Sequence, residues 1–469
     1  MKNFKPYPEY KDTGVDWLDK VPAHWELRKL RTVLKPKNVR NQPTLPLLSV
    51  VREKGIIKRD VTSKDENHNY IPDDLSNYKV VRSGQFAMNK MKAWQGSYGI
   101  SQYDGIVSPA YFVFELNEIE PDFFHIAIRS KAYVPFFTQA SDGVRVGQWD
   151  LSQTRMKEIP FAIPSSHEQD KIAKFIKSQT IKIARFIKTK RRMIEVLKEQ
   201  KQEIINKAVT KGLDPNVKLK PSGVNYLGDI PEHWEVRRLR FLIKGKLKYG
   251  ANSSGVDYNP DLLRYIRITD FSKDGNLNEE NKISLDVENA TEYLLNEGDL
   301  LFARSGATVG KVFKCNKLSE PSCFAGYLIK AVPNKEIILS NFLFMYTQSL
   351  VFEKWKNSIF IKATIENISA DKYAQLWVTL PKIEEQQKIL SFIENETTII
   401  DTAIDRANRE IKLIREYRTR LISDVVTGKI DVRNIEIEPV EDIEQIEDLE
   451  DIDQNEELTE LQDVKEADD

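Results

Sequence analysis

The 469-residue chain contains few of the side chains that usually build a catalytic or metal centre. Its two cysteines, Cys315 and Cys323, are too few for a disulfide framework and favour a reducing compartment. The five histidines are scattered along the sequence, at His24, His68, His125, His167 and His233. No apolar run approaches the roughly 18 residues that cross a bilayer, and the first residues do not resemble a signal peptide. We therefore expect a cytoplasmic protein without a membrane segment.

Sequence motifs of several enzyme classes are also missing. There is no Asn-Pro-Pro-aromatic tetrapeptide of the kind that holds a flipped adenine for methylation, no glycine-rich cofactor loop, no Cys-x-x-Cys and no His-Glu-x-x-His. The sequence RSGATVGK at 304–311 comes near to a phosphate-binding loop. That loop needs four residues between its glycines and a Ser or Thr after the lysine, whereas here three residues intervene and Val312 follows. We therefore expect no catalysis, metal ion or cofactor in this chain.

The net charge of −1 conceals two parts of opposite charge. From Glu436 to Asp469 the chain has 17 Asp or Glu and one lysine, Lys465. The remaining body therefore carries 69 basic and 54 acidic residues, a net charge of +15. A basic body indicates a polyanionic partner, although an excess of lysine can also serve solubility alone. The acidic run is typical of a disordered, self-repelling tail, which we place at 431–469.

Two long segments of the chain share one apolar pattern. Between 168 and 210, apolar residues recur mostly three, four or seven positions apart, which predicts one narrow apolar stripe along a helix. The pattern returns 217 positions later, and each helix of about 43 residues would be roughly 65 Å long. Neither helix can bury its stripe alone, so we expect the two to pack on each other as a coiled coil. The stripe residues are Ile172, Ile176, Ile183, Ile187, Ile194, Leu197, Ile204, Ile389, Ile393, Ile400, Ile404, Ile411, Ile414 and Leu421.

A second repeat precedes each half of the chain. Residues 14–31 and 223–240 are identical at ten of eighteen positions, and both contain Pro-x-His-Trp. This pattern favours a turn that places an aromatic residue before the first strand. No second His or Cys stands near His24 or His233, so we interpret the motif as a packing element rather than as a catalytic one.

The segments 44–165 and 263–381 alternate short β-like runs with Gly, Asp and Asn turns, and Gly84 and Gly298 open matching strands. We predict an α+β fold in which two mixed α/β domains, in a tandem pseudo-symmetric repeat, are joined by two long helices. The predicted parts are domain 1 at 1–165, helix 1 at 166–213, domain 2 at 214–382, helix 2 at 383–430 and the tail at 431–469.

Three stretches have the composition of nucleic-acid contacts. They are KMKAWQGS at 90–97, its positional partner RSGATVGK at 304–311, and the matched pair 141–152 and 358–369, where Ser152 and Ser369 resemble helix N-caps. Cationic, amide and hydroxyl side chains read base edges or hold phosphates, and Trp can stack. Such loops are also often merely solvated. The candidate DNA-binding residues are Lys90, Lys92, Trp94, Gln95, Ser97, Arg145, Gln148, Arg304, Ser305, Thr308, Lys311, Lys362 and Thr364.

The motifs together resemble a known family. The repeated Gly-Val-x-x-Leu-x-x-x-Pro-x-His-Trp-Glu, the runs KMKAWQGSYG, GDLLFARSGATVGK and ATIENIS, and the helix start Pro-x-x-x-Glu-Gln at Pro164 and Pro381 carry the likeness. The chain resembles, over about 14–430, the specificity (S) subunit of bacterial type I restriction–modification enzymes. The acidic tail departs from the family pattern.

The resemblance implies a non-catalytic subunit with two target-recognition domains, each reading one half of a bipartite double-stranded DNA target. It implies that the long helices pack antiparallel as a spacer and bind two methyltransferase (M) subunits, which motor-nuclease (R) subunits join. S-adenosylmethionine, ATP and magnesium are then expected on those partner subunits and none on this chain.

The residues by themselves leave two alternatives open. A coiled-coil scaffold that joins two protein-binding domains would share the helix pattern without touching nucleic acid, and it would not bind random duplex DNA at low salt. A self-sufficient DNA enzyme is opposed by the missing motifs. Two dissimilar domains on a repeated frame favour recognition of two dissimilar half-sites.

The acidic tail generates a first prediction. Truncation after Asn434 should leave the protein folded and raise its affinity for random DNA, because the removed carboxylates repel phosphates at low salt. Titration of a labelled random duplex with the full and the shortened chain measures the effect. Loss of soluble protein on truncation would show instead that the tail packs on the body.

Overall fold

The computed structural model describes residues 4–15, 17–52, 54–59, 71–72, 74–143, 149–271, 277–306, 308–360 and 367–437. These residues divide into two compact units. The first unit combines residues up to 190 with those from 408 onward, and the second consists of residues 191–407. Each unit therefore contains one mixed domain and a part of each long helix.

The domain of the first unit is built on the four-stranded antiparallel sheet β4-β11-β8-β9. Phe86 of its buried strand β8 lies opposite Phe114 of β11 and Ile100 of β9, and Phe124 of α2 packs edge-on against Phe86. The elements are β1 Tyr10–Asp12, β2 Lys20–Pro22, β3 Glu26–Lys29, α1 Leu30–Val33, β4 Leu34–Lys37, β5 Leu48–Val51, β6 Gly55–Lys58, β7 Lys79–Val81, β8 Phe86–Asn89, η1 Ala93–Gln95, β9 Tyr98–Ile100, β10 Gly105–Val107, β11 Tyr111–Leu116, α2 Pro121–Ile128, α3 Val134–Gln139, β12 Ser141–Asp142, β13 Asp150–Leu151, α4 Gln153–Lys157 and β14 Pro160–Ile163.

The domain of the second unit repeats this frame with the sheet β18-β25-β22-β23. This domain also contains another four-stranded sheet, with the strand order β19-β21-β20-β24. The elements are β15 Leu219–Pro221, β16 Asp229–Pro231, β17 Glu235–Arg238, η2 Leu239–Phe241, β18 Lys248–Tyr249, β19 Val256–Asp257, β20 Leu263–Ile266, η3 Ile268–Asp270, β21 Ile283–Leu285, η4 Ala290–Tyr293, β22 Leu300–Ala303, β23 Val312–Lys314, β24 Ser322–Phe324, β25 Leu328–Ala331, α6 Ser340–Thr347, α7 Leu350–Phe360, α8 Ala370–Ala374 and β26 Trp377–Leu380.

The predicted matching strands are confirmed as β8 and β22. Gly84 and Gly298 precede them with φ of 82° and 93°, a left-handed conformation that favours glycine. In both units the last strand before the long helix returns to pair with the strand after Pro-x-His-Trp, β14 with β3 and β26 with β17. The repeat in the sequence is therefore a repeat of topology.

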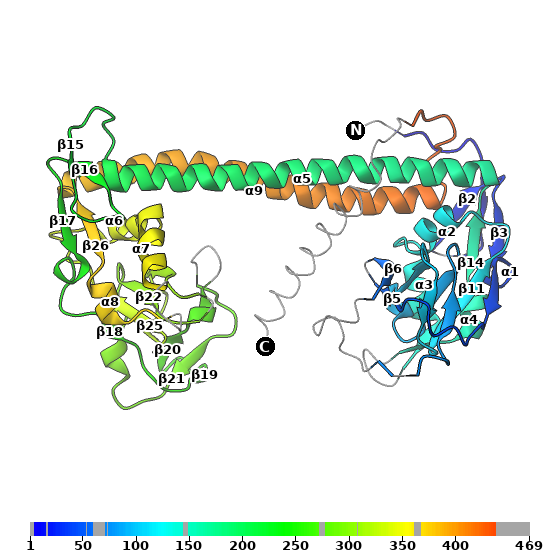
Figure 1. Ribbon diagram of the computed structural model, residues 1–469, viewed down its shortest axis with the longest axis horizontal. Helices are drawn as coiled ribbons and strands as arrows, with labels where there is room; N and C mark the ends of the chain where they lie inside the picture. The colour runs from blue at the N-terminus through cyan, green and yellow to red at the C-terminus, as the bar shows by residue number, and fades with distance from the viewer. Residues whose placement is uncertain are drawn as a thin grey trace. The chain divides into compact units, whose positions relative to one another are not determined.

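The long helices are α5, Ser166–Lys211, and α9, Ile383–Val426, which lie side by side within each unit (Figure 1). In the first unit the beginning of α5 shares a core with the end of α9, through Ile172 and Leu421. The second unit has the reverse arrangement, through Val209 and Ile389. Ion pairs Lys190–Glu410 at 2.7 Å and Lys201–Asp401 at 2.6 Å follow the same order. The helices thus run antiparallel in each unit, and the predicted fold class is confirmed.

The apolar stripes face inward along both helices. Ten of the fourteen stripe residues are buried, and four are half-buried: Leu197, Ile204, Ile404 and Ile414. At the end of α5 the buried residues are Ile205, Ala208 and Val209 rather than Ile204. Ala208 and Val209 follow Ile205 by three and four positions, and all three side chains pack in the core of the second domain. The buried face of α5 is therefore shifted by one residue at this end of the helix.

The start of each helix is tied to Pro-x-His-Trp by a glutamate. Glu168 accepts hydrogen bonds from Tyr7 Oη at 2.6 Å and Trp25 Nε1 at 3.1 Å, and His24 Nε2 lies 3.0 Å away. In the second unit Glu385 lies 3.0 Å from His233 Nε2. The two histidines therefore hold a helix start, as expected of a packing element.

The neighbouring glutamine repeats a second contact. Gln169 donates to the carbonyl of Pro164 at 2.9 Å and accepts from the amide of Glu120 at 2.8 Å. Gln386 makes the same contacts, to Pro381 at 2.9 Å and from Leu339 at 2.8 Å. Glu-Gln thus ties each helix to both the first turn and the loop before α2 or α6.

The segment after α9 packs on the first unit. Val432 is fully buried, Ile435 and Ile437 contact the core, and the Asp431 amide donates to the Lys5 carbonyl at 2.9 Å. The expectation of disorder from residue 431 is therefore wrong for 431–437, because this apolar segment closes the N-terminal domain. A truncation that spares this contact ends after Ile437, and residues 438–469 lie outside the described part of the chain.

A prediction concerns the two helix-start glutamates. Burial and the hydrogen bond to Glu168 raise the pKa of Tyr7 well above its ordinary value, so Tyr7 remains a donor. Glu168→Ala leaves the buried Tyr7 and Trp25 donors unpaired and should cost about 2–4 kcal/mol. Glu385→Ala should cost about 1 kcal/mol or less, since Glu385 is partly exposed and its carboxylate contacts only His233 among the described residues. Urea unfolding measures both, and equal losses would contradict a role for the extra donors.

A second prediction concerns the stripes. Ile183→Asp combined with Ile400→Asp places two unpaired charges on the buried faces of α5 and α9 and should cost several kcal/mol. The control is Ile399→Asp, because Ile399 is 70% exposed on the same helix as Ile400. Thermal melting distinguishes them. A double variant that melts like the wild type would disprove the packing of these helices.

Candidate nucleic-acid interface

The first candidate loop is the turn between β8 and β9. It contains the 3₁₀ helix η1, which ends at Gly96 with φ of 92°. Lys92 is exposed, whereas the half-buried Lys90 pairs with Asp150 at 2.8 Å. Trp94 and Gln95 are half-buried, and the Trp94 ring lies 5.2 Å from that of Trp149. Among the described residues Lys92 has no ion-pair partner, so this loop presents an unpaired cation beside an aromatic pair.

One candidate of this loop is corrected by the structure. Ser97 is 1% exposed, and its carbonyl accepts from the Asn89 amide at 3.0 Å in the β8–β9 hairpin. Its hydroxyl therefore points into the protein and is not available to DNA in this conformation. The sequence pattern gave no sign that the hairpin ladder begins at this residue.

The second candidate loop occupies the same place between β22 and β23. The Arg304 guanidinium lies 4.9 Å over the ring of Tyr249. Ser305 and Thr308 are half-buried, and Lys311 at the end of the loop is exposed. The two loops are equivalent in position and different in chemistry: the first has a Lys–Asp pair, and the second has an arginine stacked on a tyrosine.

The third pair of stretches converges on these loops. The Leu151 amide donates to the Lys90 carbonyl at 3.0 Å, and the Ile368 amide donates to the Arg304 carbonyl at 2.9 Å. Ser152 and Ser369 are confirmed as N-caps of α4 and α8. The remaining candidates of these stretches lie outside the described residues: Arg145, Gln148, Lys362 and Thr364.

Buried polar atoms without a hydrogen-bond partner gather at the same two loops. Within the described residues, Trp94 Nε1, Arg304 Nε and Asn367 Oδ1 are three of the six such side-chain atoms. An unpaired buried polar group costs about 1–3 kcal/mol. Asn367 pairs with Ser305 in a β-bridge, so two of the three atoms belong to the second loop. Polar atoms of this kind can be satisfied by a ligand that enters the loop.

Two aromatic residues of the second loop were missed in the sequence. Tyr327 is 66% exposed, and its carbonyl accepts from the Arg304 amide at 3.0 Å. Tyr249 is 41% exposed, and its hydroxyl accepts from the Ala370 amide at 2.9 Å. Only strand pairing places them beside Arg304, since Tyr327 lies 23 positions and Tyr249 lies 55 positions from it in the sequence. An exposed ring beside a guanidinium can make apolar contact with a base.

Burial shifts the pKa values of Lys79 and of both cysteines. The pKa of Lys79 is lowered, mainly by burial and further by the charges of Arg40 and Lys90. By contrast, burial raises the pKa of Cys315 and of Cys323 to about 12, so neither thiol is a nucleophile near neutral pH.

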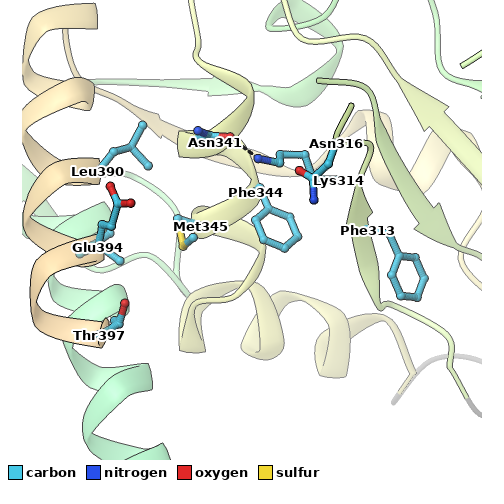
Figure 2. Close-up of a pocket in the computed structure, with 10 residues that line it drawn as sticks. Phe313, Lys314, Asn316, Asn341, Phe344, Met345, Leu390, Glu394 and Thr397 are labelled. Carbon is cyan, nitrogen blue, oxygen red and sulfur yellow. Dashed lines mark hydrogen bonds between the residues drawn. The ribbon is translucent and has the colours of Figure 1, made fainter. Parts of the chain in front are cut away.

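The second unit also has an open cavity away from these loops, where β23, α6 and α9 meet (Figure 2). Phe313, Phe344 and Leu390 supply apolar lining, and Lys314 donates to Asn341 Oδ1 at 2.6 Å. The only charged groups in the lining are Lys314 and Glu394. This lining has neither the carboxylate pair of an acid–base site nor a glycine-rich cofactor cradle.

The described part of the chain contains neither a metal-ligand cluster nor a membrane-spanning helix. There, no three His, Cys, Asp or Glu side chains are grouped so as to hold a metal ion. Among the same residues no helix is both long and apolar enough to cross a membrane.

Comparison with known proteins agrees with the geometry. Residues 231–413 match the family described as the type I restriction modification DNA specificity domain. The chain is 23% identical over 379 residues to the type I restriction enzyme MjaVIII specificity subunit of Methanocaldococcus jannaschii, covering 78% of this chain and 85% of that protein. It is 25% identical over 292 residues to the EcoBI specificity subunit of Escherichia coli, covering 60% of each. The chain is therefore similar to type I specificity subunits, and residues 231–413 match the family of their DNA specificity domain.

Solved structures agree in fold. A chain from a structure of the type I R-M system superimposes with a TM-score of 0.64 at 16% identity, covering 87% of this chain and 99% of that one. The HsdS subunit from Thermoanaerobacter tengcongensis superimposes with a TM-score of 0.50 at 15% identity. The fold that this chain shares with these solved structures therefore extends over both halves, including the first, which the family match at 231–413 does not reach.

Proposed function

We propose that this chain is a type I specificity subunit that recognises a bipartite double-stranded DNA target, with each domain reading one half. The observation that carries the proposal is the pair of equivalent loops, β8–β9 and β22–β23, whose frames agree and whose side chains differ. A shared frame would present both loops to DNA in the same manner. Different side chains would then select different bases.

The side chains divide by the contacts that they can make. Arg304 is suited to a guanine edge, which arginine contacts through two hydrogen bonds, and Gln95 to an adenine edge. The exposed Lys92 and Lys311 can hold phosphates, which position the protein without specifying sequence. The exposed rings of Tyr249 and Tyr327 would add apolar contact at the second half-site.

The proposal extends to partners. Two methyltransferase subunits would dock on the α5–α9 pair, and motor-nuclease subunits would join through that complex. The apolar residues still exposed on these helices support a docking role, since Val196 and Leu413 occupy equivalent positions in the repeat and are 46% and 57% exposed. S-adenosylmethionine, ATP and magnesium would be bound by the partners, and the chain itself would hold no cofactor and carry out no reaction.

A methylation-site map tests the division into half-sites. The reconstituted complex carrying Arg304→Ala should lose about 1–3 kcal/mol of discrimination at one position of one half-site, because a base contact is removed. Lys92→Ala should affect only the other half-site if Lys92 contacts a base, and all sequences alike if it contacts a phosphate.

The control is Lys218→Ala, which removes an exposed cation outside both loops and should leave the map unchanged. Relaxation of both halves by Arg304→Ala would contradict the model of one domain for each half-site. Absence of any sequence preference in the wild-type complex would contradict DNA recognition altogether.

A further inference from the structure

The two domains differ in how they neutralise one basic strip. The strip follows Pro-x-His-Trp in each domain, along β3 to β4 in the first and β17 to β18 in the second. Its equivalent positions are set by strand pairing: Lys29 lies opposite Pro160, and Arg238 lies opposite Trp377. The strips can therefore be compared residue by residue.

In the first domain the strip is largely neutralised. Glu158, which ends α4, accepts from Lys29 and from Arg31, the latter at 2.6 Å. Lys37 of β4 pairs with Glu115 of β11 at 2.7 Å. Three of the cations of this strip thus have a carboxylate within contact distance.

In the second domain the equivalent carboxylates are absent. The residue that ends α8 is Gln375, which accepts from Arg238 and brings no charge. Lys248 of β18 lies opposite a second lysine, Lys330, where the first domain has Val113 opposite Lys37. In the second domain Gln375 and Lys330 thus leave the charges of the strip without the carboxylate contacts of the first domain.

Four exposed cations result. Arg240, Lys244, Lys246 and Lys248 make no ion pair with any carboxylate in the described residues. Arg240 rests on the exposed ring of Phe241, 4.7 Å from its centroid. The strip ends at Tyr249, and the Arg304 guanidinium of the second loop lies over the ring of Tyr249. The strip therefore adjoins the second loop.

We propose that Arg240, Lys244, Lys246 and Lys248 form a phosphate-binding track for duplex DNA, and that the second domain supplies most of the salt-dependent affinity of the chain. This inference rests on the proposed function. Unpaired cations release counterions from DNA when they contact phosphates, whereas cations already paired with carboxylates contribute less. The first domain would then depend more on contacts to bases.

The test uses the full chain and a labelled random-sequence duplex, with the dissociation constant measured over a series of KCl concentrations. The triple variant Arg240→Gln, Lys244→Gln and Lys248→Gln should make the fall of log association constant with log salt shallower. The magnitude of the slope should decrease by about 2–3, at about 0.9 for each lost phosphate contact. The matched control is Arg31→Gln with Lys35→Gln and Lys37→Gln, which removes the same charge from the first domain.

The control should change the slope by less than one. Equal falls for both triple variants would overturn the inference, because they would reflect net charge alone. Failure of the wild type to bind duplex at low salt would instead contradict the proposed function. An RNA duplex of the same sequence that binds more tightly, and loses its affinity in the second-domain variant, would assign the track to RNA and overturn it as a DNA site.

A single exchange gives a gentler version of the same test. Gln375→Glu introduces into the second domain the carboxylate that the first domain has at Glu158. It would contact Arg238, which already binds Gln375, and we expect it to reach Arg240 as Glu158 reaches the equivalent Arg31. The magnitude of the salt slope should decrease by about 1, although no cation is removed. The reverse exchange, Glu158→Gln, removes the carboxylate that binds Lys29 and Arg31 and should increase the magnitude of the slope. Unchanged slopes in both variants would show that these carboxylate positions do not govern phosphate binding.

Discussion

Burial of one narrow apolar stripe along each long helix is the constraint on which the rest of this protein depends. A helix of this length cannot hide such a stripe by itself, so α5 and α9 pack antiparallel in each unit. The Glu-Gln pair at each helix start then attaches a domain to the helix. The Glu168 carboxylate binds three side chains of the first domain, whereas the Glu385 carboxylate binds His233 of the second domain.

A conserved frame with altered side chains explains how one fold can serve two recognition tasks. The sheet order, the N-caps of α4 and α8, and the amides that bind Lys90 and Arg304 are the same in both domains. The groups on that frame differ: Asp150 neutralises Lys90, whereas Arg304 stacks on Tyr249. Backbone contacts thus preserve geometry while side chains are free to vary.

The sequence contained much of the fold because its signals are periodic or repeated. Helical spacing predicted α5 and α9, the offset of 217 predicted their equivalence, and the glycines before β8 and β22 marked matching strands. The site was predicted less completely. The sequence pattern predicts Ser97 as a contact although the hairpin buries it, and it does not predict Tyr249 and Tyr327 because nothing local connects them to Arg304.

The sequence by itself determined the duplication, the helix pair, the basic body and the lack of catalytic motifs, since each is a matter of residue type and spacing along the chain. Only the tertiary structure decided which cations are free. Arg31 and Arg240 occupy equivalent positions in the sequence repeat, yet Arg31 pairs with Glu158 whereas Arg240 pairs with no carboxylate of the described residues. The reason is physical: neutralisation depends on groups more than a hundred residues away, which strand pairing brings within a few ångströms.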